Sequence, residues 1–250
     1  MKKYICFIIL FCFASFITKA KQTDIYNTSK GELKITMLGW SGVKFEYNNK
    51  IIYVDPSLRK NSEVNPNYDT LAKADYIFIT HAHFDHFNIE VIKKLLKPET
   101  HLIVNDECYK ILGTSLGKIV ITRVVNNKEY DFAGLEFFVT PAYNLSGEEG
   151  KIYHPEGVGN GYIFNFDNFK VLVAGDTENI PELKTLKNID VAFLPLNRPF
   201  TMDDNMFINL VLSFKPKIVY PYHYDDNYLA NVIKALNKNT EIELKIRQVK

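Results

Sequence analysis

The chain has 250 residues, of which 46% are hydrophobic and 24% charged, and its formal net charge is +1. This length and composition suit one domain with a sizeable core, and we see no repeat, low-complexity tract or linker that would divide it. The near-neutral charge gives no electrostatic case for binding nucleic acid or an anionic membrane surface, so we expect no nucleic-acid partner.

The first 20 residues have the features of a secretory signal peptide. Two lysines follow Met1, an apolar run covers residues 4–17, and Thr18-Lys19-Ala20 supplies small residues for cleavage. The run is short for a membrane span, although an uncleaved N-terminal anchor is the alternative. We therefore predict a signal peptide over residues 1–20 and one domain over 21–250, exported to the periplasm or secreted after cleavage near Ala20.

Cysteine use agrees with a chain that needs no disulfides. Cys6 and Cys12 lie in the leader, which leaves Cys108 alone in the predicted domain. A single cysteine cannot form a disulfide framework, although an exported protein would meet an oxidising compartment. We expect Cys108 to be a small buried residue in a helix.

The predicted domain opens with short strands. A polar, extended lead-in over residues 21–31 is followed by alternating segments at 33–38, 43–47 and 51–54, which predict an antiparallel meander. Asp55-Pro56 ends this meander. We interpret Asp55 as a hydrogen-bonding support for the histidine loop that follows, and the alternative is a carboxylate that only begins a turn.

Potential metal ligands are concentrated between residues 80 and 87. The sequence Thr80-His81-Ala82-His83-Phe84-Asp85-His86-Phe87 follows an apolar run, residues 76–79, that predicts a buried strand. Neutral imidazole and carboxylate are the ligands that zinc and similar cations accept. Because these residues leave a strand as a loop, His81 and His83 can bind one ion while Asp85 and His86 turn toward a second.

Strands and helices alternate through the rest of the chain. We predict a helix capped by Asn88, a strand at 102–104 with a structural His101 before it, and a long polar loop over residues 144–161. The remaining expected elements are strands at 119–121 and 135–139, assigned to a second sheet, strands at 162–166, 170–174, 190–194, 217–220 and 241–249, and helices beginning near 180, 203 and 228.

Two of these strands end in further potential ligands. Gly175-Asp176-Thr177 follows the apolar residues 171–174, and Pro221-Tyr222-His223-Tyr224 follows residues 218–220. A carboxylate and an imidazole at strand ends are candidates to join the residues of the histidine loop. The alternatives are a turn residue for Asp176 and a buried histidine for His223.

The order of these motifs resembles that of the metallo-β-lactamase superfamily of metal-dependent hydrolases, over about residues 33–249. The resemblance implies an α/β fold, the four-layer αββα sandwich. Within the superfamily the chain looks most similar to the branch of ascorbate-6-phosphate lactonase and N-acylphosphatidylethanolamine phospholipase D. The features that support this branch are Val54-Asp55-Pro56, Thr140-Pro141-Ala142 and Thr201-Met202.

The resemblance also implies a pair of divalent metal ions. The ligands it assigns are His81 and His83 for the first ion, Asp85, His86 and His223 for the second, and Asp176 for both. We count Asp85, His86 and Asp176 as the catalytic residues. Two ions, zinc or else manganese or iron, can share a hydroxide that attacks a carbonyl or phosphorus centre.

One position departs from the family pattern. The superfamily places a third histidine for the first ion after the middle strand, and the residue here is Asn144. One hypothesis is that the loop brings in His154 to replace it, as a ligand or a substrate contact. Alternatively, Asn144 binds directly or through a water, or the first site is weak and the enzyme uses one metal ion.

The predicted activity is hydrolysis of a lactone or a phosphodiester-type bond in a small-molecule or lipid-like ester. One alternative is a lipid phosphodiesterase similar to phospholipase D, for which we expect an apolar groove near the long loop. Another is a degenerate metal-binding module without turnover, which Asn144 alone supports. The sequence carries no signal for an oligomeric state.

Overall fold

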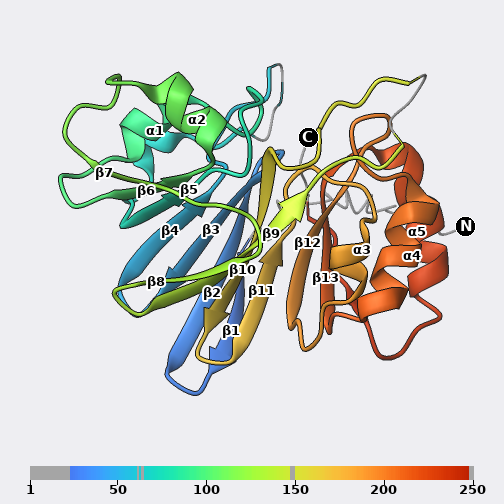
Figure 1. Ribbon diagram of the computed structural model, residues 1–250. Helices are drawn as coiled ribbons and strands as arrows, with labels where there is room; N and C mark the ends of the chain where they lie inside the picture. The colour runs from blue at the N-terminus through green and yellow to red at the C-terminus, as the bar shows by residue number, and fades with distance from the viewer. Residues whose placement is uncertain (1–22, 61, 63–64, 147–149, 248–250) are drawn as a thin grey trace, which may run out of the picture.

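The computed structural model describes residues 23–60, 62, 65–146 and 150–247. Two seven-stranded sheets lie face to face, and helices cover the outer face of each sheet (Figure 1). This is the predicted αββα sandwich of mixed sheets. The predicted signal peptide, residues 1–20, lies outside the described residues.

The first sheet is antiparallel at its start and parallel at its end. Its strands, in spatial order, are β1 (Thr23–Thr28), β2 (Gly31–Leu38), β3 (Gly42–Tyr47), β4 (Lys50–Val54), β5 (Tyr76–Phe78), β6 (His101–Val104) and β7 (Val120–Arg123). The meander predicted for residues 33–54 is confirmed as β2 to β4. Its outer helices are α1 (Ile89–Leu95) and α2 (Asp106–Leu112), with a short 3-10 turn at Tyr68–Thr70.

The second sheet is antiparallel from β8 to β11 and parallel from β11 to β14. Its strands are β8 (Lys128–Phe132), β9 (Leu135–Ala142), β10 (Gly159–Phe166), β11 (Phe169–Val173), β12 (Val191–Leu196), β13 (Ile218–Tyr224) and β14 (Glu243–Leu244). The helices on its outer face are α3 (Pro181–Lys184), α4 (Asp204–Phe214) and α5 (Asp226–Leu236). The described parts of the connection from β9 to β10, residues 143–146 and 150–158, lie at the upper right in Figure 1.

Strand periodicity explains how β5 is buried on both faces. Phe78 points between the sheets and makes edge contacts with the rings of Phe137 and Phe164, at 4.9 and 4.8 Å between centroids. Its neighbour Ile77 belongs to the outer cluster that α1 and α2 cover. Because successive side chains alternate across a strand, a strand between two apolar layers has an uninterrupted apolar sequence. The buried strand predicted at residues 76–79 is therefore confirmed.

The structure differs from the expected strands in four places. The lead-in is a strand, β1, and a further strand, β8, precedes β9. Both are polar edge strands whose outward residues face water, which removes the apolar signal. β7 belongs to the first sheet rather than the second, where it pairs in parallel with β6. The strand expected at residues 241–249 is reduced to Glu243–Leu244 within the described part of the chain.

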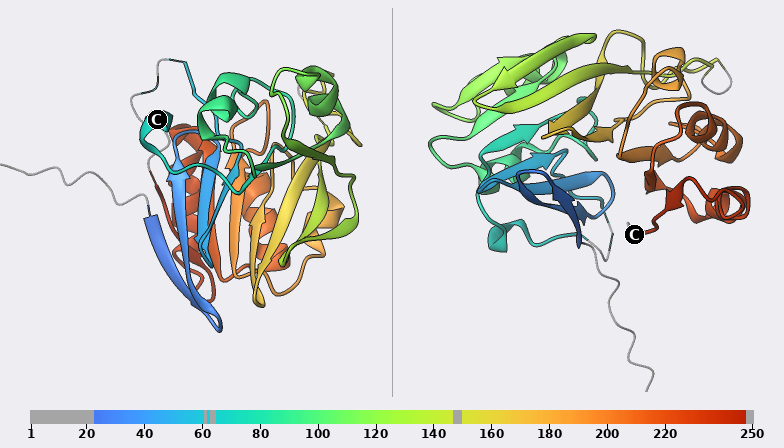
Figure 2. Two further views of the ribbon diagram at one scale, coloured as in Figure 1. Left: turned by 90° about the vertical axis from the view of Figure 1, so that its left-hand side faces the viewer. Right: turned by 90° about the horizontal axis from the view of Figure 1, so that it is seen from below.

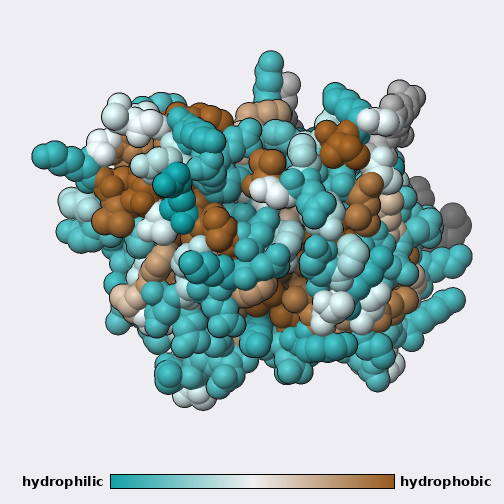
Figure 3. Space-filling view, viewed as in Figure 1, coloured by the Kyte–Doolittle hydropathy of each residue, from teal (hydrophilic) through white to brown (hydrophobic). Residues whose placement is uncertain are grey.

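The described surface is mainly hydrophilic on the face drawn in Figure 3, with small apolar patches over the α1 and α2 end and along the upper edge. Within the described ranges, no helix is long and apolar enough to cross a bilayer. Cys108 is fully buried on α2, as predicted.

One charged cluster joins the first strand to the end of the chain. Asp24 on β1 accepts hydrogen bonds from Arg247, at 2.7 and 2.8 Å to Nη2, and from the Tyr220 hydroxyl of β13 at 2.8 Å. Figure 2 shows the blue N-terminal strands beside the red C-terminal segments at this edge. Burial alone would raise the pKa of Asp24, but the hydrogen bonds from Arg247 and Tyr220 lower it below its ordinary value.

We expect Asp24→Asn to lower the free energy of unfolding by about 1–2 kcal/mol at pH 7, because a charge-assisted contact between the two sheets is lost. A lowered pKa stabilises the fold above the unfolded-state pKa near 4, and this contribution is lost as the pH falls through the folded-state pKa. The difference between wild type and variant should therefore shrink below about pH 4. Denaturant unfolding at several pH values measures it.

Asp69→Asn is the matched control, because Asp69 pairs with Lys94 while 63% of its side chain is exposed. Its effect should stay below about 0.5 kcal/mol. Equal effects of the two substitutions would contradict a role for Asp24 in joining the sheets.

Candidate metal centre

The histidine loop begins where β5 ends and is fixed from the opposite sheet. The Tyr162 hydroxyl donates to the carbonyl of Ile79 at 2.7 Å, and the Asn160 backbone N–H donates to the carbonyl of Thr80 at 2.9 Å. Both donors lie on β10. The loop that carries the ligands is therefore held by the second sheet before any side chain of the loop is considered.

Asp55 supports this loop from the end of β4. Its fully buried carboxylate accepts from the Thr80 backbone N–H at 2.8 Å, from the Thr80 hydroxyl at 2.6 Å and from His86 Nδ1 at 2.8 Å. These contacts leave His86 Nε2 directed at Asp176. Asp55 thus occupies the supporting position that the sequence predicts, and three donors to one carboxylate are more than a turn residue requires.

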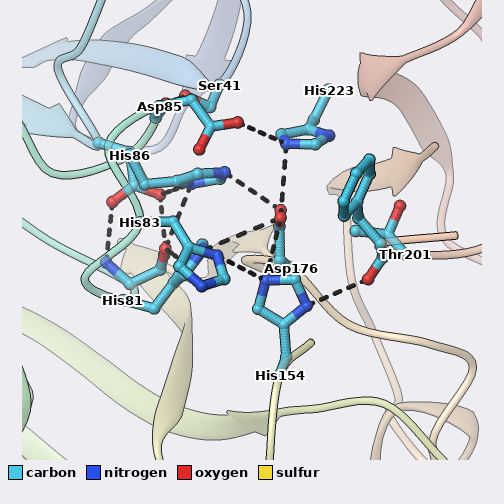
Figure 4. Close-up of polar contacts among 12 residues, drawn as sticks. Ser41, His81, His83, Asp85, His86, His154, Asp176, Thr201 and His223 are labelled. Carbon is cyan, nitrogen blue, oxygen red and sulfur yellow. Dashed lines mark hydrogen bonds and ion pairs between the residues drawn. The ribbon is translucent and has the colours of Figure 1, made fainter. Parts of the chain in front are cut away.

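Asp176 reaches the cluster because Gly175 precedes it. Gly175 has a φ of +68°, and a Cβ at this position would lie 2.6 Å from the carbonyl oxygen of Asn160. Only glycine fits such a turn without moving β10. Asp176 then lies at the centre of the side chains drawn in Figure 4.

His223 reaches the cluster from the opposite direction. Its φ is +47°, which is uncommon for a residue with a side chain. Its backbone N–H donates to the carbonyl of Trp40 at 2.9 Å, and the Trp40 and His223 rings lie 4.6 Å apart. A residue in this conformation persists only where its surroundings hold it, and such residues cluster at functional sites.

The first group of potential ligands contains His81, His83, His154 and Asp176. His83 Nδ1 lies 3.2 Å from His81 Nε2 and 3.0 Å from His154 Nε2. Asp176 Oδ2 lies 3.4 Å from His154 Nε2 and 3.9 Å from His81 Nε2. Three imidazole nitrogens and one carboxylate oxygen therefore surround a single point.

The second group contains Asp85, His86 and His223. His223 Nε2 lies 3.1 Å from Asp85 Oδ2 and 3.4 Å from Asp176 Oδ2, and His86 Nε2 lies 3.2 Å from Asp176 Oδ1. Asp176 contacts both groups, one on each side (Figure 4). Every residue weighed as a ligand, other than Asn144, lies in one of these two groups.

The donor set fits divalent cations. A tetrahedral zinc ion with bonds of about 2.0–2.1 Å to nitrogen separates its ligand atoms by about 3.3 Å, close to the spacing in the first group. His86 Nε2 and Asp176 Oδ1 are both buried and lie 3.2 Å apart, and neither has a hydrogen-bond partner in the described structure. A cation between these two buried atoms would satisfy both of them.

The electrostatics of the first group also suit a cation. Burial and the neighbouring His86 lower the pKa of His81 well below its ordinary value, and burial lowers the pKa of His154 to about 4. Both rings are therefore neutral at pH 7 and offer a nitrogen lone pair. Although burial opposes it, His223 and His86 lower the pKa of Asp176 well below its ordinary value, so its carboxylate is charged.

His86 differs from its neighbours. Burial would lower the pKa of His86, but the carboxylates of Asp176 and Asp55 outweigh burial and raise it well above 6.5. Without a cation at Nε2, the two carboxylates therefore favour the protonated form of the ring. A cation at Nε2 would replace that proton, and Nδ1 would still donate to Asp55.

Asn144 lies behind the cluster and holds His154. Its side-chain oxygen accepts from the His154 backbone N–H at 2.9 Å, and its Nδ2 donates to the carbonyl of Phe200 at 2.9 Å. The same Phe200 carbonyl accepts from His154 Nδ1 at 3.1 Å, which leaves His154 Nε2 facing the other ligands. The loop histidine His154 is therefore a member of the first group, and Asn144 is not.

Sequence reasoning missed some supporting residues. The hydroxyls of Ser41 and Ser57 both donate to the backbone carbonyl of Asp85, which fixes the middle of the ligand loop. Serine in a turn is too common a signal to have identified them. His101, predicted to be structural, bonds the Thr122 hydroxyl at 2.7 Å and belongs to neither potential ligand group.

A cavity of about 350 Å³ opens onto the ligands. Trp40, Arg59, Phe84, Tyr153 and Phe200 form much of its wall. A larger hollow of about 500 Å³ lies between β8, β9 and β10, but its lining holds no member of either ligand group. The cavity over the ligands is therefore placed for chemistry, and a smaller one of about 150 Å³ borders His81, His83 and His154.

The family comparison agrees with this centre. A model of the β-lactamase superfamily domain matches residues 34–223, which include both ligand groups. The chain belongs to the β-lactamase superfamily. A UPF0173 metal-dependent hydrolase of Staphylococcus aureus (strain MRSA252) is 29% identical over 77% of this chain and 86% of its own length. A relative in Bacillus thuringiensis (strain Al Hakam), also described as a UPF0173 metal-dependent hydrolase, is 30% identical with the same coverage.

Solved structures show the same superfamily fold. A chain from Parabacteroides distasonis, provisionally described as a metal-dependent hydrolase, is 39% identical with a TM-score of 0.81 over 92% of this chain and 99% of its own. A metallo hydrolase from the archaeon Ignicoccus hospitalis is 23% identical with a TM-score of 0.67, covering 86% and 95% of the two chains, and shows the fold alone. This superfamily member is therefore a metal-dependent hydrolase.

Replacing His154 with alanine should reduce the metal content of the protein from about two ions per chain to about one, because the first group loses one of its three nitrogens. Elemental analysis after dialysis measures the ratio. His101→Ala is the control, since it removes a histidine outside both groups and should leave two ions. Two ions retained in His154→Ala would contradict the assignment of His154 as a ligand.

Proposed function

We propose that this metal-dependent hydrolase uses two divalent ions, zinc in each position, to cleave a lactone or phosphodiester-type bond with water. The observation that carries the proposal is the position of Asp176 between two separate groups of ligands. A carboxylate with two oxygens can contact both ions and offset part of their charge. When bound, such ions lower the pKa of a water molecule and stabilise negative charge on the substrate oxygen.

The chain itself prepares the site in two ways. His86 and His154 are each fixed by a hydrogen bond through Nδ1, so that Nε2 faces the centre without rotating. Such supporting partners set the tautomer and direction of a metal-binding histidine. The buried ring of Trp40 in the cavity wall excludes water from one side of the ligands, which strengthens the electrostatic interactions within.

Zinc is favoured over manganese or iron by the donor set. The two groups together provide five imidazole nitrogens and two carboxylates, and nitrogen-rich sites suit zinc better than harder cations. The alternative of a degenerate module without turnover rested on Asn144 standing where a histidine ligand was expected. With His154 beside His83 at 3.0 Å, the first group has three nitrogens without Asn144.

We also propose that the chain is exported after cleavage near Ala20.

A chelator should abolish hydrolysis of γ-butyrolactone or of bis(p-nitrophenyl) phosphate, and zinc should restore it. Asp176→Asn should lower kcat/KM by at least about 1,000-fold, because the charged contact to both ligand groups is lost. Absorbance or pH-stat assays measure the rates. The proposed reaction would be contradicted if protein with its full metal content cleaved neither substrate.

A second candidate, hydrolysis of a lipid phosphodiester, is favoured by the cavity entrance. Phe84 is 72% exposed and Phe200 is 41% exposed, and both line the cavity. Leu145 and Ile152, on the connection between β9 and β10, are also exposed. Apolar side chains beside an ester-cleaving centre suit an acyl chain, as the predicted apolar groove near the long loop requires.

If the substrate is a lipid, Phe84→Ser should lower the rate on phospholipid vesicles by about tenfold while the rate on bis(p-nitrophenyl) phosphate stays within about twofold, because only the lipid needs the apolar entrance. Leu212→Ser is the control, since Leu212 is an exposed apolar residue on α4. Equal rates for all three proteins on vesicles would rule out this candidate.

A further inference from the structure

The cavity contains a cation that the proposed reaction does not use. Arg59 lies in the loop after β4 and lines the same cavity as His83, Asp85 and Asp176. We propose that Arg59, stacked on Trp40, binds a compact anionic group of the substrate, a carboxylate or a phosphate, separate from the bond that is cleaved. The inference rests on the proposed function, since it names the class of ester that the site takes.

Arg59 is held in place from both ends. Its guanidinium carbon lies 3.4 Å from the centre of the Trp40 ring. Its backbone N–H donates to the side-chain oxygen of Asn65 at 2.9 Å, and its carbonyl accepts from Asn65 Nδ2 at 2.6 Å. A flat guanidinium stacked on an aromatic ring keeps its N–H donors around its edge, where a planar or tetrahedral oxyanion can accept two of them.

The stack also ties Arg59 to the metal centre. The Trp40 ring, 4% exposed, contacts both the Arg59 guanidinium and the ring of His223, whose centroid is 4.6 Å away. The backbone contact between Trp40 and His223 further fixes the position of Trp40 relative to His223. An anion bound to Arg59 therefore lies at a set position relative to the second ligand group, which is what a specificity contact needs.

The charges around the cavity leave Arg59 available. The two carboxylates that share its cavity, Asp85 and Asp176, are engaged by histidines of the second ligand group. In the described ranges, the Arg59 guanidinium lies over the Trp40 ring and forms no ion pair with a carboxylate. A half-buried guanidinium that faces a cavity and has no carboxylate partner of its own is complementary to an anionic ligand.

The test compares two lactones, γ-butyrolactone and its 3-carboxylic acid, with metal-loaded wild type, Arg59→Met, Arg59→Lys and Lys60→Met. Wild type should prefer the carboxylic acid by at least about tenfold in kcat/KM. Arg59→Met should lower kcat/KM for the acid by about 10- to 100-fold, mainly through KM, and leave γ-butyrolactone within about twofold. Arg59→Lys should recover part of the loss, and Lys60→Met, an exposed neighbour, should behave as wild type.

A binding measurement gives a second readout. Trp40 is the one tryptophan of the chain, so its fluorescence reports on the stack. Succinate should change this fluorescence saturably, neutral succinamide should not, and Arg59→Met should weaken succinate binding by at least about tenfold.

The outcomes separate the two claims. If neither lactone is hydrolysed in a chelator-sensitive reaction but succinate binding depends on Arg59, the proposed reaction on lactones is overturned and the anion site is supported. Both lactones hydrolysed with equal efficiency by wild type and Arg59→Met would overturn the anion site and support the reaction. A loss of activity on both lactones in Arg59→Met would also overturn it, because Arg59 would then support Trp40 rather than bind an anion.

Discussion

The buried carboxylate of Asp55 is the constraint on which the centre depends. It accepts three hydrogen bonds from Thr80 and His86, and so joins the end of β4 to the loop after β5. A buried charge of this kind is stable only when its donors are all in place. The requirement fixes the direction of His86, which meets Asp176 from the opposite sheet. The two sheets are thus aligned at the point where their ligands converge.

The features that the sequence predicted correctly depend on local signals. The apolar strand before residues 80–87 and the motifs at residues 175–177 and 221–224 are each recognised from a few consecutive residues. Such local signals can be recognised without knowledge of the tertiary structure. They are specific because core packing alone rarely places several potential ligands directly after a buried strand. They sufficed for the sandwich fold, the superfamily and the convergence of Asp85, Asp176 and the histidines.

The remaining features depend on contacts between distant segments. β1 is polar and is held by pairing with β2 and by the contact of Asp24 with Arg247 near the other end of the chain. The placement of β7 follows from its parallel pairing with β6, which its own four residues do not encode. The exchange of Asn144 for His154 is of the same kind. The sequence left three ligand arrangements open, and the carbonyl of Phe200, supplied by another loop, orients the histidine.

The central claim is that Asp176 lies between two metal positions, the first of which His154 completes. The most direct test is a crystal structure of the zinc-loaded protein with anomalous diffraction measured on both sides of the zinc absorption edge. We expect two zinc peaks on either side of Asp176, one at about 2.0–2.1 Å from nitrogens of His81, His83 and His154. A single peak, or a first peak whose ligands exclude His154, would contradict the claim.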